Sequence, residues 1–186
     1  MLSLGTVLFW GSLWGAWEAT AGHLFHLARI PGAAGIVMFP IGFLIMARAF
    51  AATGKQSSIV WTAGVAAAIK LTDLLLPGTD FFMVINPAQA ILLESIAVVA
   101  IFSFSNTAKR SSLAVPILAS VSWRLAYAFV SLFAAGSYGA ANFFQAGILS
   151  PFRFLIVEAV CDGLLVFVVL RILEMIRFSP RRPVYE

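Results

Sequence analysis

The chain has 186 residues, of which 61% are hydrophobic and 11% are charged, and its formal net charge at pH 7 is +4. It contains several apolar stretches long enough to cross a hydrocarbon layer of about 30 Å, and no polar block large enough to fold separately. This composition excludes a soluble domain and predicts an integral membrane protein. The basic residues cluster beside the apolar stretches, where membrane topology explains them, so the charge does not indicate nucleic-acid binding.

Hydropathy and the positions of Gly and Pro predict an all-α bundle of six transmembrane helices. The predicted spans are 3–28, 34–52, 58–76, 87–105, 113–135 and 152–176. Residues 1–176 are therefore expected to form one transmembrane domain, and 177–186 a short basic tail. The first apolar stretch has no basic segment before it and no small-residue cleavage site after it, so we expect a retained helix rather than a signal peptide.

Lys and Arg are distributed unevenly between the two sets of connections. One set, together with the tail, contains most of them: Arg48, Lys55, Lys109, Arg110, Arg177, Arg181 and Arg182. The other set contains Arg29 and Arg153 and no Lys. Because short cytoplasmic loops retain positive charge, both termini of this multi-pass protein of the cell membrane are expected in the cytoplasm.

Two segments of the second half are similar to each other. FFMVINPAQAILLESIAV and FFQAGILSPFRFLIVEAV both begin with Phe-Phe, continue through Pro87 or Pro151, and reach Glu94 or Glu158 seven residues after the proline. Repeated helical hairpins explain this similarity, and chance in an apolar sequence explains it equally well. Under either explanation, Pro87 and Pro151 are each expected in the first turn of a helix, which tolerates the missing N–H of proline.

Ionisable residues interrupt the predicted spans, where an unpaired charge costs several kcal/mol. Counted from the outer end of each span at about 1.5 Å per residue, nearly all of them lie about 5 to 15 Å deep. Glu18 lies on or beside a stripe of small residues and is therefore expected to face the bundle. The sequence thus predicts a polar layer in the outer half, formed by Glu18, Lys70, Asp73, Glu94, Arg124 and Glu158, with Asp162 slightly deeper.

Two interpretations of these charges stay open. In the first they are structural, with Lys70 and Asp73 as an i,i+3 pair and Arg124 neutralising a glutamate. In the second they bind a ligand, because five acids face only two bases within the spans: Glu18, Asp73, Glu94, Glu158 and Asp162 against Lys70 and Arg124. The three acids in excess are expected to be protonated, to be reached by Arg153, or to be compensated by a cationic ligand, an ion or water.

His23 and His26 form an i,i+3 pair that predicts either metal ligation together with Glu18 or two polar residues at the membrane interface. A regular helix places Glu18 and His23 about 140° apart, so a three-ligand site would need a break at Gly22. The chain has no Gly-rich phosphate loop, no His-Glu-x-x-His motif and no Ser or Cys with a partner base, so we expect no cofactor and no catalytic residue.

Across its whole length the chain resembles the substrate-binding S components of energy-coupling factor (ECF) transporters. The resemblance lies in the six spans, the inside termini, the Gly/Ala stripe of the first helix, and the polar layer below outer loops rich in Gly and Pro. It implies a subunit that binds a vitamin or another micronutrient from outside, and that works with a transmembrane scaffold subunit and two cytoplasmic ATPases. It also implies that Gly11, Gly15 and Ala19 contact the scaffold.

The leading hypothesis from the sequence is therefore a substrate-binding subunit of an uptake transporter, with an outward-facing polar cavity and no enzymatic activity of its own. The predicted ligand-binding residues are Glu18, His26, Lys70, Asp73, Glu94, Arg124 and Glu158. The acid excess favours a ligand with a cationic group. The alternatives are an intramembrane metal-binding or redox enzyme that uses His23, His26 and buried carboxylates, and an assembly subunit whose charges only specify packing.

Overall fold

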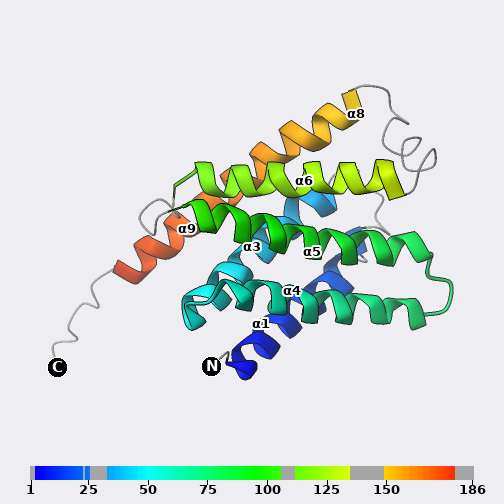
Figure 1. Ribbon diagram of the computed structural model, residues 1–186, viewed down its shortest axis with the longest axis horizontal. Coiled ribbons are helices and arrows are strands. Elements are labelled where there is room, and N and C mark those ends of the chain that lie inside the picture. Colours follow the sequence, from blue (N-terminus) through cyan, green and yellow to red (C-terminus); the bar gives the residue numbers. More distant parts are fainter. Residues whose placement is uncertain (1–2, 23, 26–32, 106–111, 135–148, 179–186) are drawn as a thin grey trace, which may run out of the picture.

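The computed structural model describes residues 3–22, 24–25, 33–105, 112–134 and 149–178. These residues form helices joined by turns, without a strand, and each of the six predicted ranges contains a helix (Figure 1). Within the described residues, four helices are long and apolar enough to cross a membrane: Ile36–Thr53, Gln56–Leu75, Phe81–Phe104 and Ala114–Phe133. The first and the last predicted ranges are not among these four, because α1 has only 14 residues and α9 carries several ionisable side chains.

The described part of the first half contains the helices α1, α3 and α4. α1 spans Leu4–Trp17 and continues into the π-helical turn η1, Glu18–Gly22. α3 spans Ala33–Thr53 and is followed by Gly54, whose φ of 66° is one that residues with a side chain rarely adopt. α4 spans Gln56–Leu71, and the short 3-10 turn η2, Thr72–Leu75, extends it.

The second half begins with α5, which spans Phe81–Phe104 and so starts earlier than the predicted residue 87. The cause is Asp80, whose Oδ1 accepts hydrogen bonds from the backbone N–H groups of Phe82 at 2.8 Å and Met83 at 3.3 Å. Pro87 consequently lies inside α5, and the prediction that it stands in the first turn is wrong.

The last helices are α6, Ala114–Ala134, and a continuous segment made of α8 (Leu149–Phe152), the π-helical turn η4 (Arg153–Val157) and α9 (Glu158–Phe178). Pro151 lies in the short helix α8. The two similar segments of the sequence thus differ locally, because Glu94 lies in the middle of a regular helix and Glu158 directly follows a π-helical turn.

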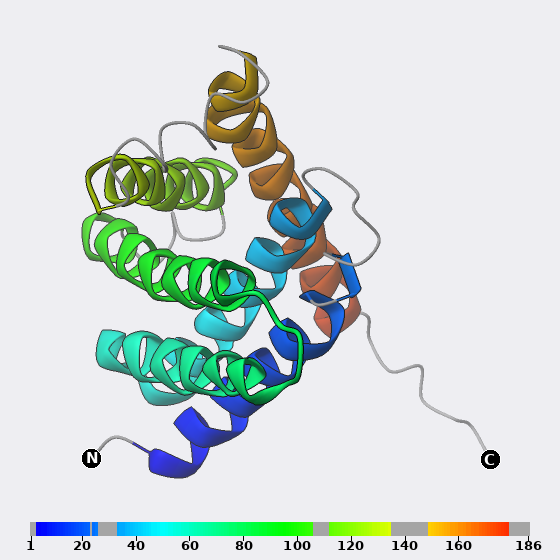
Figure 2. The same cartoon turned by 90° about the vertical axis from the view of Figure 1, so that its right-hand side faces the viewer.

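The helices pack in a closed ring in the order α1, α4, α5, α6, α9 and α3. Figure 2 shows α4, α5 and α6 stacked as one layer, with α1, α3 and α9 forming the other. α3 also contacts α4 and α5, so it is the most central helix. The order brings together helices far apart in the sequence, and two such contacts, α1 with α4 and α3 with α9, build much of the interior.

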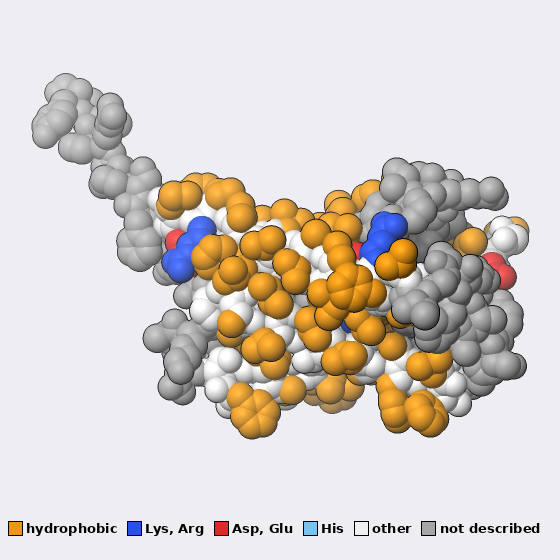
Figure 3. Space-filling model, turned by 90° about the horizontal axis from the view of Figure 1, so that it is seen from above, with side chains coloured by type: hydrophobic (Ala, Val, Ile, Leu, Met, Phe, Trp, Pro, Cys, Tyr) orange, Lys and Arg blue, Asp and Glu red, His pale blue; other side chains and the backbone are white. Residues whose placement is uncertain are grey.

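Burial is inverted relative to a soluble protein. Large apolar side chains such as Trp61, Ile96 and Phe129 are exposed on the outside, and Figure 3 shows one face covered mainly by hydrophobic side chains. Charged side chains are buried inside, together with an aromatic and aliphatic core. An apolar exterior around buried charges suits a bundle surrounded by lipid, where the acyl chains solvate the outer surface.

The small-residue stripe of α1 packs against α4. A methyl group at Gly11 would lie 2.6 Å from Val65 Cβ, and one at Gly15 would lie 2.7 Å from Ile69 Cβ. Gly11 and Gly15 are buried and Ala19 is partly exposed. The two glycines that the family resemblance assigns to a scaffold contact are thus covered by the chain's own α4, because the absence of Cβ lets the two helices approach closely.

Candidate functional site

A partly open cavity of about 380 Å³ lies between the helices at one end of the bundle, where α4 ends and α5 begins. We call this end the cavity end. Most of the lining is apolar or aromatic, and its acidic and basic side chains are Glu18, Lys70, Asp80 and Glu94. The other lining residues are Gly22, Met38, Phe82, Met83, Asn86, Pro87, Ala90, Ile91, Trp123, Tyr127 and Phe154.

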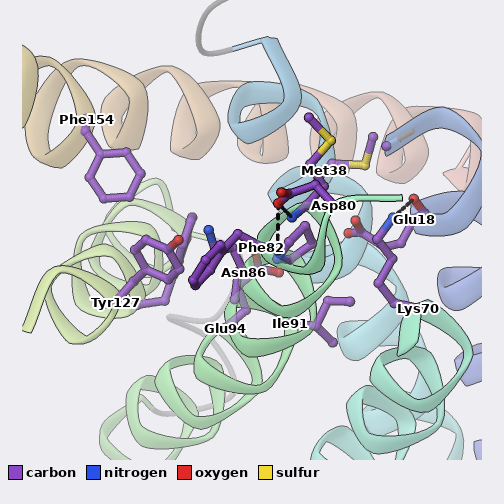
Figure 4. A pocket seen from close by; sticks show the side chains of 15 residues that line it. Glu18, Met38, Lys70, Asp80, Phe82, Asn86, Ile91, Glu94, Tyr127 and Phe154 are labelled. Carbon is purple, nitrogen blue, oxygen red and sulfur yellow. Dashed lines mark hydrogen bonds between the residues drawn. The ribbon is translucent and has the colours of Figure 1, made fainter. Parts of the chain in front are cut away.

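The lining changes in chemical character from one side of this cavity to the other. Figure 4 shows Glu18 and Lys70 on one side, Tyr127 and Phe154 on the other, and residues of α5 between them. α5 contributes more lining residues than any other helix, and Pro87 removes its own N–H from the helical ladder, so that Met83 lacks the usual bond to its carbonyl. The cavity therefore offers one polar and one aromatic end to a bound molecule.

Glu18 is 4% exposed and is held by the helix that carries it. Its Oε1 accepts a hydrogen bond of 3.1 Å from Nε1 of Trp14, one turn earlier in α1. Trp14 is fully buried because α3 has a glycine, Gly42, at the point of contact: a methyl there would lie 2.6 Å from Trp14 Cζ2. Within the described residues, no basic side chain forms an ion pair with Glu18.

Lys70 reaches the same place from α4. Its Nζ forms an ion pair of 2.7 Å with Asp73 Oδ2, and both side chains are buried. The Nζ also donates a hydrogen bond of 3.4 Å to the backbone carbonyl of Glu18, not to its carboxylate. The positive charge of Lys70 is therefore matched by Asp73, as the i,i+3 spacing predicts.

Glu94, from the middle of α5, is the least compensated charge of the cavity. It is 3% exposed, and its Oε2 has no hydrogen-bond partner in the described part of the chain. A methyl at Gly42 would lie 3.1 Å from this Oε2, so the same glycine makes room for Trp14 and Glu94. A buried acceptor without a partner costs free energy that a donor from a ligand would recover.

A second polar cluster lies behind the aromatic side, between α6 and α9. Arg124 is fully buried, and its Nη1 lies 3.0 Å from Asp162 Oδ2 while its Nη2 lies 3.6 Å from Glu158 Oε2. Ser120 donates a 2.9 Å hydrogen bond to Asp162, and Arg153 Nε lies 3.5 Å from Glu158 Oε1. We call these five residues the Arg124 network.

Both buried cations also bind a backbone carbonyl of a π-helical turn. Lys70 donates to the Glu18 carbonyl in η1, and Arg124 Nε donates to the Phe154 carbonyl in η4 at 2.8 Å. A π turn shifts the helical ladder by one residue, which takes one carbonyl out of the i→i−4 pattern. The N–H of Glu158, bonded to the Arg153 carbonyl, shows this shift in η4. Each cation thus stabilises an irregular turn that borders the cavity.

The aromatic side consists of Trp123, Tyr127 and Phe154, whose ring centroids lie 5.9 to 6.2 Å apart. The Arg124 guanidinium lies 4.5 Å from the centroid of Trp123 and 5.1 Å from that of Phe154, so it packs behind these rings. Nε1 of Trp123 is buried without a hydrogen-bond partner among the described residues. The rings therefore separate the cavity from the Arg124 network.

The structure brings some of the predicted site residues together and separates others. Glu18, Lys70 and Glu94 line the cavity, whereas Asp73 lies behind Lys70. Arg124 and Glu158 belong to the Arg124 network and do not line the cavity. Arg124 forms ion pairs with both Glu158 and Asp162, and Arg153 reaches Glu158, which was one of the expected ways to compensate an excess acid. The acids without an ion pair in the described chain are therefore two, Glu18 and Glu94.

Several lining residues are missing from the sequence-based site. Trp123 and Tyr127 are an i,i+4 aromatic pair with Arg124 between them, a pattern that could have marked them. Asn86 could have been marked in the same way, because it is a polar residue within a predicted apolar region, directly before Pro87. Met38 and Met83 give no signal of this kind, because methionine fills irregular apolar spaces in any core. Phe82, from the first turn of α5, also lines the cavity.

The metal-binding alternative concerns residues that are not described. His23 and His26 lie outside the described residues, and so does the predicted contact of His26 with a ligand. Among the described residues, no group of three or more His, Cys, Asp or Glu side chains is arranged to hold a metal ion. Comparisons of the chain with family models, with curated proteins and with solved structures gave no match.

Proposed function

We propose that this chain is a multi-pass membrane protein that binds a small organic cation in the cavity, as the substrate-binding subunit of an uptake transporter for a micronutrient or another small molecule. One observation carries the proposal. Among the described residues, five of the seven buried charged side chains form ion pairs with one another, and the two that do not, Glu18 and Glu94, both line the cavity.

The physical chemistry of the lining favours a cation with an apolar or aromatic body. A positive charge close to Glu18 and Glu94 would offset two carboxylates that have left water. The aromatic faces of Tyr127 and Phe154 would contact the rest of the ligand, and aromatic faces also attract organic cations. A volume of about 380 Å³ lies within the usual range of about 300–1,000 Å³ for small-molecule sites.

The transport role rests on topology. With six transmembrane helices and both termini in the cytoplasm, the positive-inside distribution puts the cavity end on the outside, where a substrate arrives. The family resemblance adds a transmembrane scaffold subunit and two ATPases as partners. A scaffold would have to use a surface other than Gly11 and Gly15, since these are covered by α4.

The test is thermal stabilisation of the purified protein by a panel of primary amines, quaternary ammonium ions, their uncharged isosteres, carboxylates, vitamins and divalent metal ions. A ligand present at about 100 times its Kd stabilises the folded state by about 2.7 kcal/mol, which raises the Tm by several degrees. We expect organic cations to raise the Tm and their uncharged isosteres to have little effect.

The matched variants are Glu94→Gln and Glu174→Gln, because the same change is made in the cavity and in an exposed ion pair of α9. We expect the stabilisation to disappear in E94Q and to persist in E174Q. A folded wild-type protein that responds to no member of the panel would overturn the proposal, and a response only to metal ions would favour the metal-binding alternative.

A further inference from the structure

Among the described residues, the buried groups around the cavity carry an excess of negative charge when all of them are ionised. Five buried carboxylates, Glu18, Asp73, Glu94, Glu158 and Asp162, face the buried cations Lys70 and Arg124 and the half-exposed Arg153. The difference is two negative charges. Because Asp73, Glu158 and Asp162 have ion-pair partners, this excess falls on Glu18 and Glu94.

In the described part of the site, the charged groups around this pair come from α4, η2, α6, η4 and α9, and Tyr127 of α6 is a further titratable group in the lining. α4 and η2 contribute Lys70 and Asp73, α6 contributes Arg124, and η4 and α9 contribute Arg153, Glu158 and Asp162. Asp80 lies at the rim of the cavity, where it caps α5 and is exposed. α3 lines the cavity with Met38, which does not titrate.

Burying two carboxylates without a counter-charge is costly, and a proton removes that cost by neutralising the group. Glu18 accepts a hydrogen bond from Trp14, which stabilises its ionised form. Glu94 has a buried Oε2 without a partner in the described residues, so an ionised Glu94 would be the more expensive of the two. Glu94 is therefore the better site for a proton when the cavity holds no ligand.

We propose that binding of an organic monocation to this cavity displaces a proton from Glu94, so that the cavity exchanges a cation for a proton. This inference rests on the proposed function, because it concerns the same site. The O–H bond of the Glu94 carboxyl breaks, the proton leaves to the solvent, and the carboxylate formed stabilises the ligand cation. The net charge of the site is the same before and after binding.

The exchange fixes the sign of the pH dependence. Protons compete with the cation, so the apparent affinity falls as the pH is lowered and rises as the pH is raised. Exchange of one proton changes the affinity by up to about tenfold for each pH unit over the range in which the site is protonated.

The experiment is calorimetric titration of the detergent-solubilised full chain with benzyltrimethylammonium and with phenethylamine, at pH 7, in buffers of different ionisation enthalpy. The first probe carries a permanent charge and no acidic proton, so every proton released comes from the protein. The second is an ammonium ion with the same aromatic body. The dependence of the observed heat on buffer gives the number of protons released for each cation bound.

We expect release of about one proton per cation by whichever probe binds, following from the exchange of one charge for another. Glu94→Gln should bind the cation more weakly and, when it is titrated to saturation, should release no proton, whereas Glu174→Gln should leave the release unchanged. A third variant, H23N/H26N, tests whether the imidazoles of His23 and His26 release the proton instead. Release that is lost in H23N/H26N and kept in E94Q would overturn the assignment to Glu94.

The outcomes also separate this inference from the proposed function. Binding with no proton released, and with an affinity that does not change with pH, would overturn the exchange and leave the cation site standing. Absence of binding by both probes and by every cation of the thermal panel would overturn both.

Discussion

The Arg124 network and the cavity both bury carboxylates at the same end of the bundle, but the carboxylates of the network form ion pairs and those that line the cavity do not, as far as the described residues show. In the network, Arg124 forms ion pairs with Asp162 and Glu158 and donates to the Phe154 carbonyl, although Arg124 Nη2 and Asp162 Oδ1 have no hydrogen-bond partner among the described residues. In the cavity, Glu18 and Glu94 face open space with no ion pair from the described residues. The comparison teaches that incomplete compensation, and not the presence of buried charge, marks the candidate binding site.

Removing the cation of the paired region should have the largest effect on stability. Arg124→Met would leave Asp162 and Glu158 buried with less compensation, and we expect a loss of about 3–5 kcal/mol in the free energy of unfolding. Unfolding in mixed micelles of increasing SDS content measures it. The double change R124M/D162N should recover much of the loss, because it also removes the stranded carboxylate. A loss below about 1 kcal/mol in R124M would show that the network is not a buried ion pair.

Crowding the unpaired region should have a smaller effect on stability and a clear effect on binding. The methyl of Gly42→Ala would lie 2.6 Å from Trp14 Cζ2 and 3.1 Å from Glu94 Oε2. We expect a loss of about 1–3 kcal/mol, because the indole or α3 must shift. Gly64→Ala is the matched control, since a methyl at that helical position meets no atom within 4 Å. G64A should raise the stability by about 0.5–1 kcal/mol.

The hydrogen bond between Trp14 and Glu18 offers a finer test of how the cavity acids are held. Trp14→Phe removes the donor and keeps an aromatic ring, so we expect a loss of about 1 kcal/mol beyond the effect of packing. Trp17→Phe is the control, because Nε1 of Trp17 has no hydrogen-bond partner in the described residues. Equal losses in the two variants would mean that the bond to Glu18 contributes nothing.

The smallest effect should come from the ion pair farthest from both regions. Arg171 Nη1 lies 2.9 Å from Glu174 Oε2, but the two side chains are 52% and 43% exposed. Arg171→Ala should therefore change the free energy of unfolding by less than about 1 kcal/mol. The difference between the free energies of unfolding lost in R171A and in R124M measures how much burial strengthens an arginine–carboxylate pair in this chain.

Sequence patterns predict the helical ranges well because apolar length is a strong constraint. Burial of Glu18, Lys70, Glu94 and Arg124 is also predictable, since an ionisable group within an apolar span is stable only when it faces the interior. The start of α5 differs from the predicted residue 87 because Asp80 caps the helix directly before Phe81, and the helix then continues through Pro87.

The pairing of the charges could not be predicted in the same way. It depends on which helices are neighbours, and α6 against α9 brings Asp162, not Glu94, to Arg124. Gly163 permits that approach, because a Cβ there would collide with Ile117 of α6. Gly11 and Gly15 pack against α4 for a related reason: a small-residue stripe indicates a close helix contact but does not say with which helix.

The most direct test of the central claim compares a cation with its uncharged isostere at the two unpaired carboxylates. The measurement is the Kd of benzyltrimethylammonium and of neopentylbenzene for the wild-type protein and for the double variant E18Q/E94Q, with unfolding curves to confirm that both are folded. We expect the wild-type protein to bind the cation at least tenfold more tightly than the isostere, and the double variant to lose this preference. An undiminished preference in E18Q/E94Q would contradict the account, because the selectivity for positive charge would then come from other residues.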